Sequence, residues 1–345
     1  MTPLSGSVLI IGATLLSLLV TLAVERHSPS LGLVQAPNAR SSHTKPTPRG
    51  GGLGIAVGGV ATTLVLAISG LGALWWILPI FVVIAALGFT DDLKSLRASL
   101  RMVVQLVAFA LLLWLVGDLP PIVLLYEVAL GGVLLGALVL FGGVWWLNLY
   151  NFMDGIDGIA ASQGILILLG AAGLWLVGDA SATNQALWWW LLALAGASAG
   201  FLIRNWPPAK IFMGDAGSYF LATAIFAAAL LTIQYGGLSY ASWLLLVSVF
   251  VSDASVTLAR RMLRGERPLD AHKRHAYQIL SRRFASHGKA TGLFLAVTAL
   301  WALPLALAAQ LQPALEWPIV SIAYLTLFIA MRIAGSGNRE MQKLA

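Results

Sequence analysis

The chain has 345 residues, of which 59% are hydrophobic and only 10% are charged, and its mean hydropathy is +0.86. Because soluble domains carry about 25% charged residues, this composition excludes an ordinary soluble domain and indicates an integral membrane protein. The absence of cysteine excludes disulfide bonds and thiol catalysis.

Apolar segments follow one another along the whole chain, and most approach the ~20 residues that cross a hydrocarbon core. The first six residues hold no Lys or Arg, so residues 7–24 are expected to be a retained span and not a cleaved signal peptide. Residues 119–130 are apolar but short and begin with two prolines, which predicts a re-entrant or surface hairpin. We predict an all-α polytopic bundle of about eleven transmembrane helices, one domain over residues 1–345, with spans near 7–24, 50–70, 72–90, 101–117, 131–148, 158–177, 185–203, 217–235, 239–259, 290–309 and 317–334.

The basic residues predict the orientation of this bundle. If the N-terminus lies outside, all 21 Lys and Arg residues fall on the inside, and the outside loops carry only four acidic residues. Cytoplasmic loops are the ones enriched in Lys and Arg, so we predict N-out/C-in topology. The net charge of +7 then belongs to a cytoplasmic surface that suits anionic lipids and anionic substrates, and nucleic acid is not needed to explain it.

Aspartates from distant segments share that predicted cytoplasmic side. Asp91 and Asp92 follow the third predicted helix, and Asp215 lies between the seventh and the eighth, in Gly-Asp-Ala-Gly-Ser. Ionisable residues at membrane depth are costly and mark functional sites, and oxygen ligands beside glycine suit a cation such as Mg²⁺. A third group, within NLYNFMDGIDGIA at the end of the fifth helix, consists of Asn148, Asn151, Asp154 and Asp157.

Each acidic segment also has a purely structural interpretation. The adjacent carboxylates of Asp91 and Asp92 repel each other, and a solvated helix end neutralised by Lys94 and Arg97 explains them about as well as a cation site. The polar residues of the third group are spaced by three, which would align them on one side of a helix. They could instead cap backbone amides, but the two glycines among them favour a site.

Two polar loops complete the pattern. Residues 37–52 end in Gly50–Gly52, which lets a ligand approach the backbone, although a linker is the alternative. The loop at 264–278 places His272 and His275 among basic residues, which favours an anion over zinc, although a loop that only sets topology would look the same. Asp253 lies inside the ninth predicted helix, where a structural partner and a catalytic role are equally expected.

The motifs occur together in a recognisable order: PNxRSSHxxPTPRGGG at 37–52, DD at 91–92, NxxNxxDGxDGxA at 148–160, FMGDxGS at 212–218 and HxxH at 272–275. In this combination the chain resembles the polyprenyl-phosphate N-acetylhexosamine-1-phosphate transferase superfamily (glycosyltransferase 4 family). Within it, the single His272 and His275 resemble the branch that initiates O-antigen and other surface polysaccharides more than the peptidoglycan branch, which has consecutive histidines. One departure is Gln35-Ala36, where relatives often have an acid before Pro-Asn.

The resemblance implies a bacterial inner-membrane enzyme of about ten or eleven helices whose active site faces the cytoplasm. It would transfer N-acetylhexosamine 1-phosphate from a UDP-N-acetylhexosamine to undecaprenyl or another polyprenyl phosphate, releasing UMP. The implied cofactor is Mg²⁺, with Mn²⁺ as a substitute, and the implied partners are the lipid bilayer and a second copy of the chain in a homodimer. A peptidoglycan phospho-N-acetylmuramoyl-pentapeptide transferase and a lipid-linked transporter or flippase are the alternatives.

The resemblance also implies roles for individual residues. Asp215 would be a metal ligand together with Asp92, and Asp91 would orient or deprotonate the lipid phosphate, whose oxygen attacks phosphorus directly; a covalent aspartyl intermediate is the competing mechanism. Asp91, Asp92, Asp154 and Asp157 would together form the catalytic set. The residues implied to bind substrate are Lys45, Arg101, Asn148, Asn151, Asn205, Phe212, His272 and His275.

Overall fold

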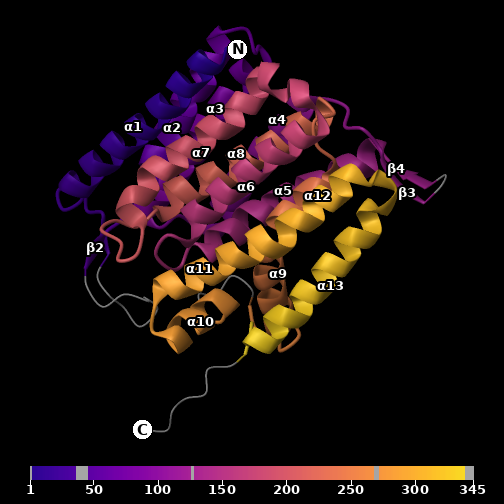
Figure 1. The fold of residues 1–345 in the computed structure, drawn as a ribbon. Coiled ribbons are helices and arrows are strands. Elements are labelled where there is room, and N and C mark those ends of the chain that lie inside the picture. The colour runs from indigo at the N-terminus through magenta and orange to yellow at the C-terminus, as the bar shows by residue number, and fades with distance from the viewer. Residues whose placement is uncertain (1, 36–45, 126–127, 268–271, 339–345) are drawn as a thin grey trace.

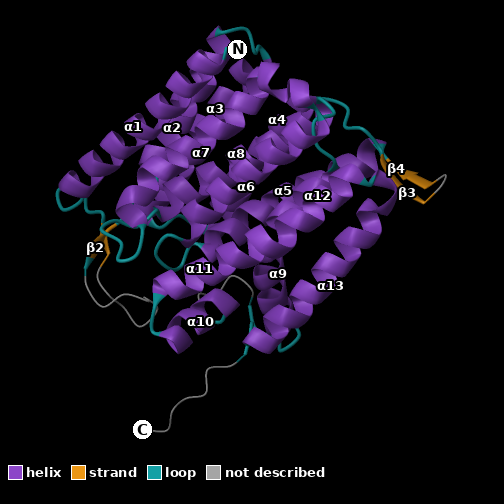
Figure 2. Cartoon of the chain, viewed as in Figure 1, coloured by secondary structure: helices purple, strands orange, loops and turns teal. Residues whose placement is uncertain are grey.

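A computed structural model describes residues 2–35, 46–125, 128–267 and 272–338. In these ranges the chain forms thirteen α-helices, most of them side by side in one bundle, and two short antiparallel hairpins (Figure 1; Figure 2). The helices are α1 (Pro3–His27), α2 (Leu53–Ile68), α3 (Ala73–Lys94), α4 (Ala98–Val116), α5 (Gly132–Met153), α6 (Ile159–Gly178), α7 (Ala186–Asn205), α8 (Gly214–Gln234), α9 (Tyr240–Met262), α10 (Ala276–Phe284), α11 (His287–Val297), α12 (Leu303–Leu311) and α13 (Glu316–Ala334). The strands are β1 (Val34–Gln35), β2 (Thr47–Pro48), β3 (Ile122–Leu125) and β4 (Val128–Leu130).

The predicted spans and the helices agree segment by segment. Among the described residues, ten helical segments are long and apolar enough to cross a membrane, and one of them joins α11 and α12 through the π-helical turn η2 (Thr298–Ala302). The one remaining predicted span, at 50–70, corresponds to α2, whose 16 residues extend about 24 Å. This length is short of the ~30 Å hydrocarbon core. The membrane bundle is thus confirmed, whereas N-out/C-in orientation remains a prediction.

The two ends of the bundle differ in character. The hairpin of β3 and β4 projects from one end, where Trp317 Nε1 donates to the carbonyl of Val123 (Figure 1). The prediction that 119–130 forms a re-entrant or surface hairpin and not a span is therefore confirmed as to the hairpin. The opposite end, called the polar end below, is formed by residues 46–52, 91–101, 151–159, 204–215, 260–267, 272–287 and 334–338, and α10 lies there (Figure 1). The nine-residue helix α10 begins within the segment 264–278, which the sequence predicts to be a polar loop.

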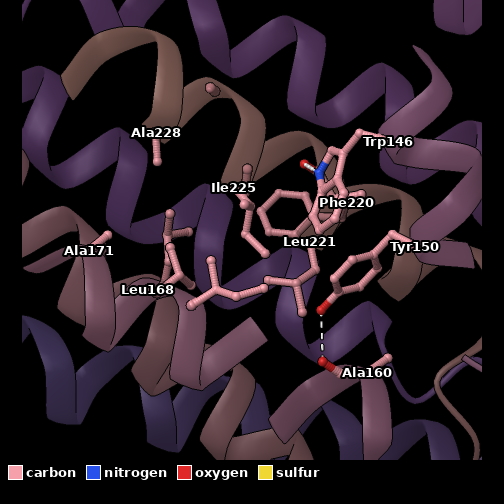
Figure 3. Packing of buried hydrophobic residues seen from close by; sticks show 14 of the residues in the cluster. Trp146, Tyr150, Ala160, Leu168, Ala171, Phe220, Leu221, Ile225 and Ala228 are labelled. Atoms are coloured by element: carbon pink, nitrogen blue, oxygen red, sulfur yellow. Dashed lines mark hydrogen bonds between the residues drawn. The ribbon is translucent and has the colours of Figure 1, made fainter. Parts of the chain in front are cut away.

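Helix α8 lies at the centre of the bundle. In its most apolar 18-residue window 89% of the residues are buried, compared with 22% in α1, α4 and α13, so the latter helices face lipid. Its side chains Leu221 and Ile225 lie toward α5 and α6 (Figure 3), and Phe220 packs edge-on against Phe81 of α3. Two aromatic side chains in this core have hydrogen-bond partners, as polar groups in hydrocarbon require: Trp146 donates to the carbonyl of Ala222 and Tyr150 donates to that of Ala160.

The glycine-rich segment before α2 is held tightly against the start of α8. The amides of Gly51 and Gly52 donate to the carbonyls of Phe212 and Met213, and the amide of Phe212 donates to Pro48. This close approach needs glycine, because a Cβ atom at Gly52 would lie 2.4 Å from the Cα atom of Gly217. The packing thereby places the residue before the glycines beside the first turn of α8.

We expect Gly52→Ala to destabilise the protein, because overpacking of a close contact costs about 1–3 kcal/mol. The thermal unfolding midpoint in detergent should fall. Gly12→Ala on α1 is the matched control, since no atom lies within 4 Å of its Cβ position. Equal midpoints for both variants would show that the α2–α8 contact is loose.

Candidate functional site

Asp92, at the end of α3, caps the first turn of α8. Its Oδ1 atom accepts from the amide of Asp215 at 2.8 Å and its Oδ2 atom accepts from the amide of Ala216 at 3.1 Å. The side chain of Asp92 has no exposed surface. A carboxylate at a helix N-terminus satisfies free amides and interacts favourably with the helix dipole. Asp92 therefore fixes the position of Asp215.

Arg49 connects these two aspartates from the glycine-rich loop. Its Nε atom lies 2.9 Å from Asp92 Oδ1 and its Nη2 atom lies 3.0 Å from Asp215 Oδ1. The acidic neighbours raise the Arg49 pKa above its usual value in spite of burial, which lowers it. The sequence places Arg49 in the motif at 37–52 and among the basic residues that indicate topology, but it assigns Arg49 no role in the site. Its place directly before three glycines is the feature that could have identified it.

Asp91 has a different set of partners. Its carboxylate accepts from the amide of Leu96 at 2.6 Å, from Arg101 at 2.7 Å and from the Tyr219 hydroxyl at 3.3 Å. Only 4% of its side chain is exposed, against 33% of Arg101. The structural interpretation of this segment, in which Lys94 and Arg97 neutralise a solvated helix end, is wrong, because both of these residues are exposed and the ion pair is made by Arg101.

The acidic group after α5 joins the same site, but not on one helix. Asn151 donates to Asp215 Oδ1 and to Ser218 Oγ, each at 2.9 Å. The helix ends at Met153, so Asp154 and Asp157 lie in the turn before α6, and the predicted alignment of the three residues along a helix is wrong. The chain turns here because Gly158 adopts a left-handed conformation with φ of 74°.

Asp154 and Asp157 have different surroundings. Burial, with the nearby charge of Asp215, raises the Asp154 pKa to about 7. The structure shows no hydrogen bond to the Asp154 carboxylate from the residues it describes. Asp157 Oδ2 instead accepts from the amide of Ala209 and lies 3.3 Å from His287 Nδ1, so it ties this turn to the loop before α8 and to α11. Asp154 therefore faces the carboxylate cluster, whereas Asp157 braces its edge.

Three of the predicted substrate-binding residues have structural contacts. Asn148 donates to Gln105 and to the carbonyl of Val144. Asn205 is buried, accepts from the amide of Gly158 and donates to the carbonyl of Ile211, so its carboxamide holds two loops together. Phe212 is half-buried and lies three residues before Asp215. Lys45, also predicted to bind substrate, lies outside the described residues.

The segment that carries His272 and His275, called the histidine loop below, packs against the turn that carries Asp154. Tyr277 donates to the carbonyl of Phe152, and the rings of His272 and His275 lie 4.8 Å apart. Burial and nearby arginines lower the pKa of both histidines to about 3, so they are neutral near pH 7. His275 is only 2% exposed. His272 is half-buried and accepts from the amide of Arg274 at 3.3 Å, so it offers a neutral N–H to a ligand.

Asp253 holds this loop in place. Its fully buried carboxylate accepts from the amides of Ala276 and Tyr277, at 2.7 and 3.1 Å, and from the Ser336 hydroxyl at 2.8 Å. It thus caps α10 from inside α9 and anchors the segment after α13. Of the two interpretations left open by the sequence, the structural partner is confirmed, and that partner is the start of α10.

The charges at the centre of the site do not balance. Four carboxylates, from Asp91, Asp92, Asp154 and Asp215, surround the guanidinium of Arg49, and Arg101 adds one further positive charge. No three acidic or histidine residues of the described chain converge as a ready-made metal site. Asp154 and Asp215 nevertheless lie near enough for the charge of Asp215 to raise the Asp154 pKa. Mg²⁺ is often held by one or two protein carboxylates together with waters and substrate phosphates, so these residues fit such an ion.

Comparison with known proteins identifies the family. The model of glycosyl transferase family 4 matches residues 74–233. A probable undecaprenyl-phosphate N-acetylglucosaminyl 1-phosphate transferase of Bacillus subtilis is 31% identical over 277 residues, which cover 78% of this chain and 75% of the relative. The chain belongs to glycosyl transferase family 4. A decaprenyl-phosphate N-acetylglucosaminephosphotransferase of Mycolicibacterium smegmatis is 33% identical over 294 residues, covering 75% and 71% of the two chains.

Other members of this family match a shorter part of the chain. A phospho-N-acetylmuramoyl-pentapeptide-transferase of Synechococcus elongatus is 34% identical over 201 residues, 53% of each chain. The family model begins in α3 and ends in α8, so it includes the aspartates at the centre of the site but neither Arg49 nor the histidine loop. The resemblance seen in the sequence motifs is confirmed at the level of the family, and the protein is a phosphoglycosyl transferase.

Replacing Asp253 should loosen the histidine loop. Asp253→Ala leaves buried donors at the start of α10 without an acceptor, which costs about 1–3 kcal/mol for each such group. We expect trypsin to cleave faster at Arg282 and Arg283 in the purified full-length protein. Ser336→Ala removes only one donor and should have a smaller effect. Equal cleavage rates in parent and Asp253→Ala would contradict the capping role.

His275 should make stability depend on pH. Its folded pKa is about 3, below the unfolded value of about 6.5, so the unfolded chain binds a proton that the folded protein excludes. Stability should therefore fall as the pH drops below about 6.5, by about 2 kcal/mol at pH 5. His275→Gln should narrow the difference in unfolding midpoint between pH 7 and pH 5. The surface variant His27→Gln should not, and identical behaviour of the two variants would refute this assignment.

Proposed function

We propose that this protein transfers N-acetylhexosamine 1-phosphate from a UDP-N-acetylhexosamine to a polyprenyl phosphate, as the first membrane step in building a surface polysaccharide such as O-antigen. The observation that carries the proposal is the convergence of Asp91, Asp92, Asp154 and Asp215 around Arg49 at the polar end. The names of the Bacillus and Mycolicibacterium relatives support the same donor and acceptor class.

The reaction forms one phosphorus–oxygen bond and breaks another. An oxygen of the lipid phosphate attacks the phosphorus attached to the sugar, and UMP leaves with the electron pair of the broken bond. Arg101, with a third of its side chain exposed, is placed to hold the lipid phosphate beside Asp91. Asp91 then orients that phosphate and accepts any proton it carries. His272 contributes a neutral hydrogen bond to the donor.

We assign the metal site to Asp215 and Asp154. The carboxylates exceed the arginines in number, Asp154 has no hydrogen bond from the described residues, and Asp215 is 15% exposed. Asp92, by contrast, is enclosed by the α8 amides and Arg49, so we assign it a positioning role and not the ligand role first expected. Mg²⁺ bound there would offset the negative charge that develops as two polyanions meet.

An apolar cavity offers a place for the lipid chain. It has a volume of about 340 Å³, lies between α5, α8 and α9, and is lined by Trp145, Leu149, Phe226 and Val251 among others. Helices α5 and α8 also carry Asn151 and Asp215 at their polar ends. A polyprenyl chain lying along this flank would bring its phosphate to the carboxylate cluster. The basic residues near this end support an active site on the cytoplasmic face of a bacterial inner membrane.

The second candidate is the peptidoglycan enzyme, favoured by the Synechococcus relative. A UMP-release assay with undecaprenyl phosphate, Mg²⁺ and a panel of UDP-sugars, including UDP-MurNAc-pentapeptide, separates the candidates. Release with UDP-GlcNAc or UDP-GalNAc supports our proposal, and release with the pentapeptide substrate alone supports the second candidate. Release with none of them would leave the transporter or flippase and refute transfer.

Asp215→Ala should abolish transfer in a folded protein, because both the metal site and the bond to Asn151 are lost. We expect UMP release to fall by at least about 100-fold, as for other groups that stabilise developing charge. Asp179→Ala is the matched control, since Asp179 caps the short helix η1 (Ala180–Asn184) away from the cluster. Near-normal turnover of Asp215→Ala at equal expression would overturn the metal assignment.

A further inference from the structure

The guanidinium of Arg49 is shared between two carboxylates that differ in their freedom to move. Asp92 has no exposed side-chain surface and is fixed by two α8 amides. Asp215 is 15% exposed and uses the same oxygen for both Arg49 and Asn151. The contact with Asp92 is therefore the permanent one, whereas the contact with Asp215 can be exchanged.

The backbone of Arg49 cannot follow such an exchange. Its amide donates to the carbonyl of Leu33 at 2.8 Å, and the two glycines at 51 and 52 are bonded to the segment before α8. The side chain is 30% exposed, so it alone has room to move. If the Arg49 guanidinium rotated about its fixed contact with Asp92, its Nη groups would face the space in front of Asp215.

The charges around Arg49 predict when it would turn. In the present arrangement it neutralises Asp215, whose other neighbours include Asp91 and Asp154. A divalent cation bound to Asp215 would repel the Arg49 guanidinium, whose Nη2 atom lies 3.0 Å from Asp215 Oδ1. A diphosphate arriving with the cation would offer that guanidinium a new planar partner of the kind that arginine binds in bidentate fashion.

We propose that Arg49 is an internal counter-ion of the metal site: it occupies Asp215 in the substrate-free enzyme and transfers to the donor diphosphate when Asp215 takes up the cation. This inference rests on the proposed function for the identity of the diphosphate. Its consequence is that cation and nucleotide sugar bind synergistically, because Asp215 becomes fully available only when Arg49 has a phosphate to bind. The free enzyme would then bind the cation weakly and avoid an unproductive metal-loaded state.

The test measures cation binding directly in the full-length protein in detergent. Mn²⁺ serves as the probe, and electron paramagnetic resonance of free Mn²⁺ gives its dissociation constant with and without UDP-GlcNAc. The parent should bind Mn²⁺ more tightly when UDP-GlcNAc is present. Arg49→Gln should tighten Mn²⁺ binding without nucleotide by about tenfold, and the additional gain from UDP-GlcNAc should largely disappear.

Two further variants separate this role from simpler ones. Arg101→Gln removes the same charge from the same site but contacts Asp91, not Asp215. It should preserve the gain from UDP-GlcNAc. Arg49→Lys is the second variant and also serves if Arg49→Gln does not fold, because it keeps the positive charge near the carboxylates. Its Mn²⁺ affinity without nucleotide should stay near the parent value. The increase in affinity caused by UDP-GlcNAc should be smaller, because an ammonium group lacks the planar geometry of a guanidinium.

Unchanged Mn²⁺ affinity in Arg49→Gln, or an equal loss of synergy in Arg101→Gln, would overturn the proposal and make Arg49 a permanent structural tie. This failure is distinguishable from failure of the proposed function. If the parent releases UMP and Arg49→Gln leaves Mn²⁺ binding unchanged, only the counter-ion role is lost. If the parent releases no UMP with any UDP-sugar and shows no synergy with UDP-GlcNAc, the proposed reaction is lost as well.

Discussion

The contact between the carboxylate of Asp92 and the amides of Asp215 and Ala216, in the first turn of α8, is the interaction on which the polar end depends. It joins the end of α3 to the start of the most buried helix in the bundle. Free amides at a helix start require acceptors, and hydrocarbon supplies none. By meeting that requirement with a side chain from a distant segment, the fold fixes Asp215 within reach of Arg49 and Asn151.

The remainder of the site follows from the cost of gathering like charges away from bulk water. Buried carboxylates need positive partners or hydrogen bonds, and here they have Arg49, Arg101, Tyr219 and Asn151. These partners do not neutralise the cluster completely. The surplus of negative charge is what makes the site suited to a divalent cation, and a reaction between two phosphates needs the same charge compensation.

A second buried carboxylate, Asp253, organises the histidine loop by the same physical device. It caps α10 from within α9, just as Asp92 caps α8 from within α3. In both places an aspartate on one helix satisfies the amides of another, so the loops between helices need little regular structure of their own. The site is thus assembled from helix ends, and the glycine-rich loop is held against α8 by backbone hydrogen bonds.

The sequence by itself determined the bundle, its span positions and the family, because apolar runs of membrane length and a set of ordered motifs are local features. It also indicated that Asp91, Asp92, Asp154 and Asp215 lie at one end of the bundle. Successive spans cross the membrane in opposite directions, and all four residues follow spans that end on the same side. It could not show which atoms meet. Lys94 and Arg97 are nearer to Asp91 in sequence than Arg101, yet Arg101 makes the ion pair.

Only the tertiary structure separated the roles of chemically equal residues. It showed that Asp92 is enclosed by amides while Asp154 has no hydrogen bond from the described residues, that Asp157 braces a turn, and that Asp253 caps α10. It also brought Arg49 into the cluster. These distinctions depend on hydrogen bonds between segments up to 124 residues apart. A side chain's role here is set by its partners across the bundle, and spacing along the chain carries no information about them.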